Sequence, residues 1–222
     1  DYTLEGAQGA TSFNEIISKG YGEPQNAKEF ADLAQWVNYD GHRSLFESRS
    51  KNRMGLLMWM SHSCWPSMVW QTYDYYLEPT AAYFAIKKAS EPLHIQWNPA
   101  TDEVEVVNYS AGTRNDLTAK VQILNMDGSV VWEKTATVNS REDTTEKCIR
   151  LEFPDNLSQV HFLKLWLTEN GNVISENFYH RSLEENNYQA LKQLPQVTLN
   201  CQSEARQDEK GNWTATVTPV SY

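Results

Sequence analysis

The sequence predicts two kinds of structure in one chain, an α/β segment followed by an all-β part. Three observations lead to this fold class. Up to about residue 92, apolar residues recur at helical spacing around one charge-free apolar run. From Leu93 onward the apolar residues alternate with period two. Tight-turn signals then recur at short intervals, which is typical of an immunoglobulin-like β-sandwich.

The α/β segment is expected to contain three helices. The first covers residues 13–18, and two glycines end it. The second begins near Asn26, an N-cap residue with Glu29 as its capping-box partner. Its apolar stripe comprises Phe30, Leu33, Ala34, Val37, Leu45 and Phe46. The third begins near Pro79, and its inward face comprises Ala82, Tyr83, Ile86 and Ala89.

Between the second and third helices lies the most informative run of the chain. Residues 56–60 (Leu-Leu-Met-Trp-Met) predict a strand buried on both faces, as in a parallel sheet covered by helices. Ser-His-Ser follows at residues 61–63, the carboxyl end of that strand, where parallel sheets place ligand-contacting groups. The indoles of Trp59, Trp65 and Trp70 flank these polar groups. Flat apolar surfaces beside hydroxyl-binding groups suit a sugar ring. The order helix, strand, loop, helix predicts the closing part of a (β/α)8 barrel over residues 1–92.

The all-β part is expected to hold a sandwich over residues 93–183. Its strands are predicted near 103–108, 117–125, 129–138, 146–153, 160–168 and 173–180. Asp127-Gly128 and Asn170-Gly171 predict type I′ hairpin turns. Residues 184–195 are expected to be a linker with one helical turn. The alternating segments Val197–Cys201 and Trp213–Val217 predict the truncated start of a further β-sandwich over 196–222.

Composition excludes several classes of function. The formal net charge of −10 opposes binding to nucleic acid or to an anionic membrane surface. Cys64, Cys148 and Cys201 lack the spacing of a disulfide framework or a zinc site, and the histidines show no paired spacing. We therefore expect no metal and no cofactor. Because the sequence opens at Asp1, we interpret it as a piece of a longer protein.

The central run resembles the last barrel strand and following loop of glycoside hydrolase family 2, in its exo-β-glucosaminidase and β-mannosidase branch. The residues that carry the resemblance are Gly55, Trp59, Met60, Trp65, Pro66, Ser67, Trp70, Gln71, Tyr73, Asp74, Tyr75 and Tyr76. The resemblance continues through Tyr21–Pro24, Phe46–Ser48, Pro79–Lys88 and Glu91–Gln96. One departure concerns the site: the branch has Leu-Asn where this chain has Ser61-His62.

The resemblance implies a retaining β-glycosidase acting on β-mannosides or β-glucosaminides, with two catalytic glutamates on earlier strands. Glu15 follows an asparagine and Glu47 stands in Phe-Glu-Ser, but both lie in helix-patterned segments, where a surface or capping role is expected. No catalytic residue is therefore expected in this chain, which alone should be inactive. The substrate-binding residues implied are Trp59, His62 and Trp65, whereas Trp70 is expected to pack within the loop.

A purely structural role is the alternative for each of these residues. Trp59 could be a barrel-core residue, and a lone histidine such as His62 is more often structural. Asp74 is the carboxylate on this loop that an amino sugar could use. A second hypothesis is a non-catalytic carbohydrate-binding module that exposes Trp132, Trp166 and Tyr179 on the sandwich. A third is a structural spacer.

The expected partners are a carbohydrate substrate and the remaining barrel of the parent protein, which in relatives acting on polysaccharides is often secreted or periplasmic. The enzyme hypothesis predicts a broad exposed apolar face on residues 1–92.

Overall fold

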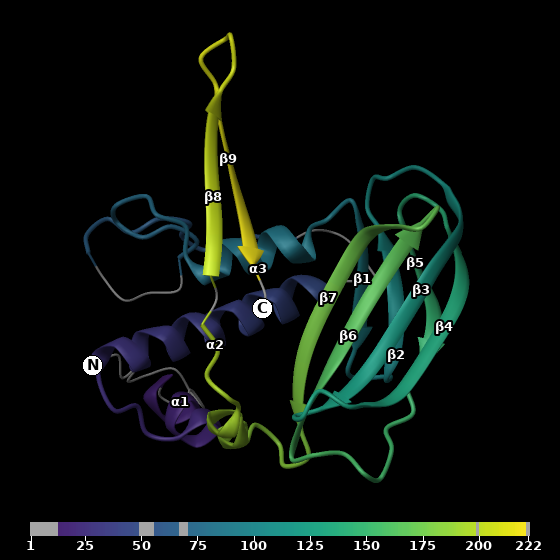
Figure 1. The fold of residues 1–222 in the computed structure, drawn as a ribbon, viewed down its shortest axis with the longest axis horizontal. Coiled ribbons are helices and arrows are strands. Elements are labelled where there is room, and N and C mark those ends of the chain that lie inside the picture. Colours follow the sequence, from purple (N-terminus) through teal and green to yellow (C-terminus); the bar gives the residue numbers. More distant parts are fainter. Residues whose placement is uncertain (1–12, 49–55, 67–70, 199, 221–222) are drawn as a thin grey trace. The chain divides into compact units, whose positions relative to one another are not determined.

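A computed structural model describes residues 13–48, 56–66, 71–198 and 200–220 (Figure 1). The chain forms two compact units, Asp1–Lys192 and Gln193–Tyr222. Within the described ranges, the first unit contains three α-helices and two sheets, and the second contains one β-hairpin. None of the described helices has the length and apolar character needed to span a membrane.

The three predicted helices are present, although α1 continues three residues beyond the predicted end and α3 begins two residues after Pro79. Helix α1 spans Phe13–Tyr21, α2 spans Ala27–Glu47 and α3 spans Ala81–Ala89. The Asn26 side chain accepts the backbone N–H of Glu29 at 2.9 Å, and the Glu29 carboxylate accepts the N–H of Gln25 at 2.7 Å. The first bond caps α2 as predicted. The second reaches the N–H of Gln25, one residue before the Asn26 N–H that a capping box uses, so the predicted capping box is only half formed. Gly22, at φ +81°, follows the end of α1.

Helix α3 packs on α2. Ala82, Ala85 and Ala89 are fully buried, because a row of small side chains lets the two helices approach closely. The side-chain oxygen of Gln35 on α2 accepts the first N–H of α3, from Ala81, at 2.8 Å. The apolar stripe expected on α2 is only half-buried over Phe30–Val37, and Leu45 is exposed.

The prediction of a buried strand at Leu56–Met60 is wrong for this chain as it stands. These described residues belong to no strand, and Leu57 and Trp59 are exposed to solvent. Met60 has φ +62°, which breaks an extended conformation. A parallel strand needs backbone hydrogen bonds from neighbouring strands. Within the described ranges, no strand lies beside this segment to provide them.

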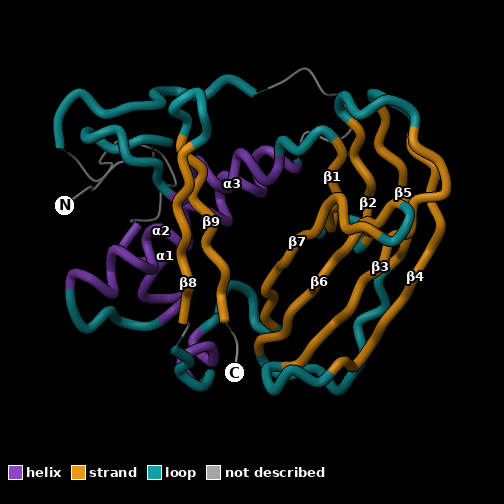
Figure 2. Tube along the Cα trace, turned by 45° about the horizontal axis from the view of Figure 1, so that its top comes forward, coloured by secondary structure: helices purple, strands orange, loops and turns teal. Residues whose placement is uncertain are grey.

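The predicted sandwich is confirmed (Figure 2). One sheet has the order β1-β2-β5, and the other has the order β4-β3-β6-β7, with all pairs antiparallel. The strands are β1 Leu93–Asn98, β2 Glu103–Asn108, β3 Arg114–Asn125, β4 Val130–Ser140, β5 Thr144–Arg150, β6 Val160–Glu169 and β7 Asn172–Ser182. The alternating inward residues of both sheets form one core, in which Ile95, Val121 and Leu165 are fully buried.

One of the two predicted hairpin turns is confirmed. Asn170 and Gly171 both have positive φ, 52° and 81°, as a type I′ turn requires. At the other turn only Gly128 has positive φ, and its N–H bonds to the carbonyl of Asn125 at 2.9 Å. The prediction of a type I′ turn there is wrong. The longer connection between β3 and β4 needs positive φ at a single residue.

The end of the chain holds a 3-10 helix, Gln189–Gln193, and a hairpin of β8 Asn200–Gln207 and β9 Trp213–Val220. Small and apolar side chains at Ala205, Ala215 and Val217 share one face of this hairpin, and threonines share the other. All its described side chains are exposed. That it begins a further sandwich remains a prediction.

Candidate functional site

The segment of residues 56–66, here called the Trp59 segment, is held by main-chain bonds to the chain that follows it. The carbonyl of Ser61 accepts the N–H of Tyr73 at 3.0 Å and the hydroxyl of Thr72 at 2.9 Å. Thr72 in turn accepts the N–H of Thr80 at 2.9 Å, directly before α3. An isolated parallel bridge pairs His62 with Tyr73. The polar end of the segment is therefore fixed to the start of α3.

The predicted substrate residues lie on this segment and are open to solvent. The side chains of Trp59 and Trp65 are 77% and 66% exposed, and His62 is also exposed. Ser63, between His62 and Trp65, is buried. Within the described residues Trp59 is not enclosed in a core, and its role in binding substrate stays a prediction. Trp70 lies outside the described residues.

Asp74 stabilises the loop that follows Tyr73, the residue paired with His62 of the Trp59 segment. One carboxylate oxygen accepts the N–H groups of Tyr76 and Glu78, at 2.8 and 2.9 Å. This arrangement closes a turn in which Leu77 has φ +67°. Tyr75 and Tyr76, in the same turn, are exposed and pack edge to face, with ring centroids 5.2 Å apart.

The two glutamates considered as catalytic candidates occupy different environments. Glu15 is exposed on α1, as expected. Glu47 is only 6% exposed, so the expected surface or capping role is wrong for it. It lies at the end of α2, where the helix meets the sandwich strands β1 and β7 (Figure 1).

Glu47 is the centre of a buried polar group, the Glu47 cluster, which comprises Glu47, His94, Asn177 and Tyr179. Its carboxylate lies 3.0 Å from His94 Nε2 and accepts bonds from Asn177 Nδ2 at 2.9 Å and the Tyr179 hydroxyl at 3.0 Å. Asn177 Nδ2 also donates to the Tyr179 oxygen at 2.8 Å. One residue of α2 thus contacts both sheets of the sandwich.

A second carboxylate holds the other side of His94. Glu91 accepts from His94 Nδ1 at 3.0 Å, from the Ser175 hydroxyl at 2.7 Å and from Lys88 at 2.7 Å. Burial alone would lower the pKa of His94, but its bonds to Glu47 and Glu91 outweigh burial and raise that pKa. Burial alone would raise the pKa of Glu91, but the bonds from His94, Lys88 and Ser175 lower it to about 2. Each ring nitrogen of buried His94 thus faces a carboxylate, an arrangement that favours its protonated form.

Arg43 extends the same network along α2. Its guanidinium lies 4.2 Å from the centre of the Tyr179 ring and donates to Asn177 Oδ1 at 3.2 Å and to Asp40 at 2.9 Å. Burial raises the pKa of Asp40, although His180 and Arg43 act in the opposite direction. Buried charges of both signs are paired here, which limits their desolvation cost.

The sequence contained one signal of this network that was missed. Ser175, Asn177 and Tyr179 are three polar residues spaced two apart on β7, so they share one face of the sheet. That face is the inward one. A polar row on the buried face of a strand indicates a polar partner from outside the sandwich.

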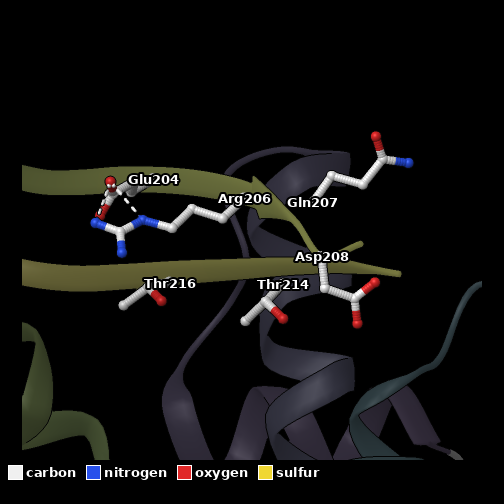
Figure 3. A pocket seen from close by; sticks show the side chains of 6 residues that line it. All are labelled: Glu204, Arg206, Gln207, Asp208, Thr214 and Thr216. Carbon is white, nitrogen blue, oxygen red and sulfur yellow. Dashed lines mark hydrogen bonds and ion pairs between the residues drawn. The ribbon is translucent and has the colours of Figure 1, made fainter. Parts of the chain in front are cut away.

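A shallow pocket lies on the polar face of the hairpin in the second unit (Figure 3). It is lined by Glu204, Arg206, Gln207, Asp208, Thr214 and Thr216. Arg206 is paired with Glu204 at 2.8 Å, and Asp208 accepts bonds from the backbone of its own turn. These charges are already engaged in local structure, and all of these side chains are exposed. The pocket is therefore a weaker candidate than the Trp59 segment.

Comparison with protein families matches residues 102–182 to a model described as a mannosidase Ig/CBM-like domain. Among curated proteins, the exo-β-D-glucosaminidase of Amycolatopsis orientalis is 34% identical over 177 residues, which are 75% of this chain and 17% of that protein. The mannosylglycoprotein endo-β-mannosidase of Lilium longiflorum is 29% identical over 181 residues, 78% of this chain and 19% of that protein. The chain thus spans about a fifth of the length of these relatives.

Among solved structures, the exo-chitosanase of Amycolatopsis orientalis superposes with a TM-score of 0.85 at 28% identity. The match covers 93% of this chain and 28% of that one. A β-D-mannosidase from Dictyoglomus thermophilum superposes with a TM-score of 0.68 at 17% identity, over 91% of this chain and 25% of that one. This second likeness concerns the fold alone.

Proposed function

Since this chain belongs to the exo-β-glucosaminidase and β-mannosidase branch of glycoside hydrolase family 2, we propose that it is part of an exo-acting β-glycosidase. In this proposal residues 1–92 are the end of its (β/α)8 catalytic barrel and residues 93–183 are the sandwich that follows. The substrate is a β-glucosaminide or a β-mannoside.

The observation that carries this proposal is the pair of exposed indoles on the Trp59 segment. Trp59 and Trp65 present flat apolar surfaces next to His62, and main-chain bonds fix the polar end of the segment to the chain before α3. A sugar has apolar C–H faces and a rim of hydroxyl groups. The C–H faces can stack on an indole, and the hydroxyl groups can form hydrogen bonds with an imidazole. The segment would form one wall of the substrate pocket.

The exposed apolar side chains of the helical segment support the same proposal. Leu45, Leu57, Trp59 and Phe84 are all exposed, and large exposed apolar areas mark surfaces that another structure covers. In the proposed enzyme, the earlier strands and helices of the barrel cover them. Leu56–Met60 would then gain the neighbouring strands that a parallel strand requires.

The proposed chemistry is hydrolysis with retention at the anomeric carbon. It needs two carboxyl groups about 5–5.5 Å apart, one as nucleophile and one as acid and base. Glu15 lies on an exposed helix face, and Glu47 is enclosed by His94, Asn177 and Tyr179. Neither is placed for this role, so the catalytic pair would come from the part of the barrel that precedes this chain.

The alternative of a separate carbohydrate-binding module receives less support. Tyr179, one of its three proposed contact residues, is buried in the sandwich core. The ring of Trp166 lies against Lys164 and Lys120, with ammonium-to-centroid distances of 5.1 and 6.0 Å. Tyr179 is thus enclosed in the core, and Trp166 shares the outer face of its sheet with lysine side chains.

The test compares two tryptophans of similar exposure in the complete enzyme. We expect Trp59→Ala to lower kcat/KM for a nitrophenyl β-glucosaminide or β-mannoside by about tenfold or more, since removal of a central aromatic contact costs roughly 2 kcal/mol. Trp213→Ala, which changes a residue 69% exposed on the hairpin, should leave kcat/KM unchanged. Equal effects of the two substitutions would contradict the role of Trp59. Complete enzyme that hydrolyses neither substrate would contradict the activity.

A further inference from the structure

The polar joint between α2 and the sandwich precedes the Trp59 segment in the chain, with residues 48–55 between them. Glu47 is the last residue of α2, and the Trp59 segment begins at residue 56. The main chain of α2 is held at the same place, because Gln96 of β1 donates to the carbonyl oxygen of Glu47 at 3.3 Å. One turn earlier, the guanidinium of Arg43 donates to the carbonyl of Phe178 on β7. The sandwich therefore fixes both the side chain and the backbone at the end of this helix.

The other end of the Trp59 segment depends on the same helix. Thr72 and Tyr73 hold Ser61, and the connection continues through Thr80 to α3, which packs on α2. The described connection from the segment to α2 thus runs through Thr72, Thr80 and α3. The orientation of α2 on the sandwich will set the position of the indoles.

The chemistry of the joint is suited to fixing an orientation. An apolar contact tolerates sliding, whereas the Glu47 carboxylate needs His94, Asn177 and Tyr179 at hydrogen-bond distance at the same time. Replacing a buried ionic group by packed apolar residues is often neutral or stabilising. Such a group is therefore better explained by specificity of geometry than by stability alone.

We propose that the Glu47 cluster positions the Trp59 segment, so that the β-sandwich sets how well the proposed enzyme holds its substrate. The cluster touches neither the substrate nor the reacting atoms. It acts through the orientation of α2. This inference rests on the proposed function, because it assigns a partner in the chain to the proposed substrate wall.

The test uses the complete enzyme and the variant Glu47→Gln, which keeps the shape of the side chain and removes its charge. KM and kcat are measured with a nitrophenyl β-glycoside at a temperature where circular dichroism shows each variant fully folded. We expect KM to rise about tenfold, since a displacement of about 1 Å in a binding group has effects of this order or larger. Loss of folded protein would instead lower the apparent kcat and leave KM unchanged.

Two further variants complete the test. Asp32→Asn, the control, removes an exposed carboxylate of the same helix that pairs with Lys28, and its KM should match the wild type. Tyr179→Phe removes only a hydroxyl, which donates to Glu47 and accepts from Asn177 and from the backbone N–H of Trp97, and its KM should rise as well. It provides the measurement if Glu47→Gln does not fold.

Each outcome decides a different question. Wild-type enzyme without glycosidase activity overturns the proposed function. Active enzyme in which folded Glu47→Gln and Tyr179→Phe keep the wild-type KM overturns the positioning role. A raised KM in these variants, with an unchanged KM in Asp32→Asn, supports it.

Discussion

The sandwich and the helical segment treat their apolar side chains in opposite ways. In the sandwich Leu163, Leu165 and Leu167 of one strand are fully buried, because the facing sheet covers them. In the helical segment Leu57 and Phe84 face solvent, and burial is concentrated between α2 and α3 and against the sandwich. The residues of this chain form a complete hydrophobic core in the sandwich. In the helical segment they form only part of a hydrophobic core.

The largest expected effect tests this contrast with one substitution at two leucines. Leu165→Ala should lower the free energy of unfolding by about 2–5 kcal/mol, because it removes buried methyl groups and leaves a cavity. Leu57→Ala should change it by less than about 0.5 kcal/mol, because that side chain is already in water. Urea unfolding of the chain, followed by circular dichroism, measures both.

A loss of similar size at both leucines would show that Leu57 is covered within this chain and would remove the contrast. In the complete enzyme the expectation changes. If the preceding barrel covers residues 56–60, Leu57→Ala should become clearly destabilising there.

Features fixed by neighbouring residues were predictable from the sequence. Asn26 caps α2 as predicted, and both residues of Asn170-Gly171 have positive φ. The alternation of apolar residues also gave the sandwich, because each strand presents one face to a core that the other strands of the same chain complete. That Trp59, His62 and Trp65 lie on one segment likewise followed from their closeness in sequence, but the exposure of Trp59 did not.

Features that depend on distant partners were not predictable. Leu56–Met60 has the composition of a buried strand. A strand also needs neighbouring strands as hydrogen-bond partners, and the composition of one segment does not show whether they are present. The partners of Glu47 lie on β1 and β7, far along the chain, and nothing in its local pattern indicated burial. Only the polar row on β7 contained that information, and it does not name α2 as the partner.

A prediction of intermediate size concerns how the stability of the chain depends on pH through His94, which lies where α2 meets the sandwich. The pKa of His94 is raised by folding, so its contribution to stability is complete below the unfolded value of about 6.5 and is lost as pH rises through the folded pKa. The groups that face His94 are Glu47 from α2, Glu91 from the turn before β1, and Asn177 from β7. Neutral His94 would remove a positive charge from beside the buried Glu47 carboxylate, whereas Glu91 would keep its pairing with Lys88.

We therefore expect the Tm of the wild-type chain to exceed that of His94→Gln most strongly near pH 6, with the difference shrinking toward alkaline pH. Calorimetry of both proteins from pH 5 to pH 9 measures it. The pKa of His180 is lowered by burial, so that residue acts with the opposite sign, and the difference between the two proteins removes its contribution. A difference that grows with pH would contradict a buried cation at His94.

The smallest expected effect applies one substitution to a glycine in each region. Gly171→Ala in the sandwich should cost about 1–2 kcal/mol, because φ is +81° and a side chain there is strained even with open space around it. Gly41→Ala in α2 should instead stabilise the chain by about 0.5–1 kcal/mol, since no atom lies within 4 Å of the added methyl group and alanine favours the helix. Chemical denaturation of both variants gives the two signs. Opposite signs are the required result, because only the backbone conformation differs between two equally open sites; destabilisation at Gly41 would show that α2 is not a regular helix at that residue in solution.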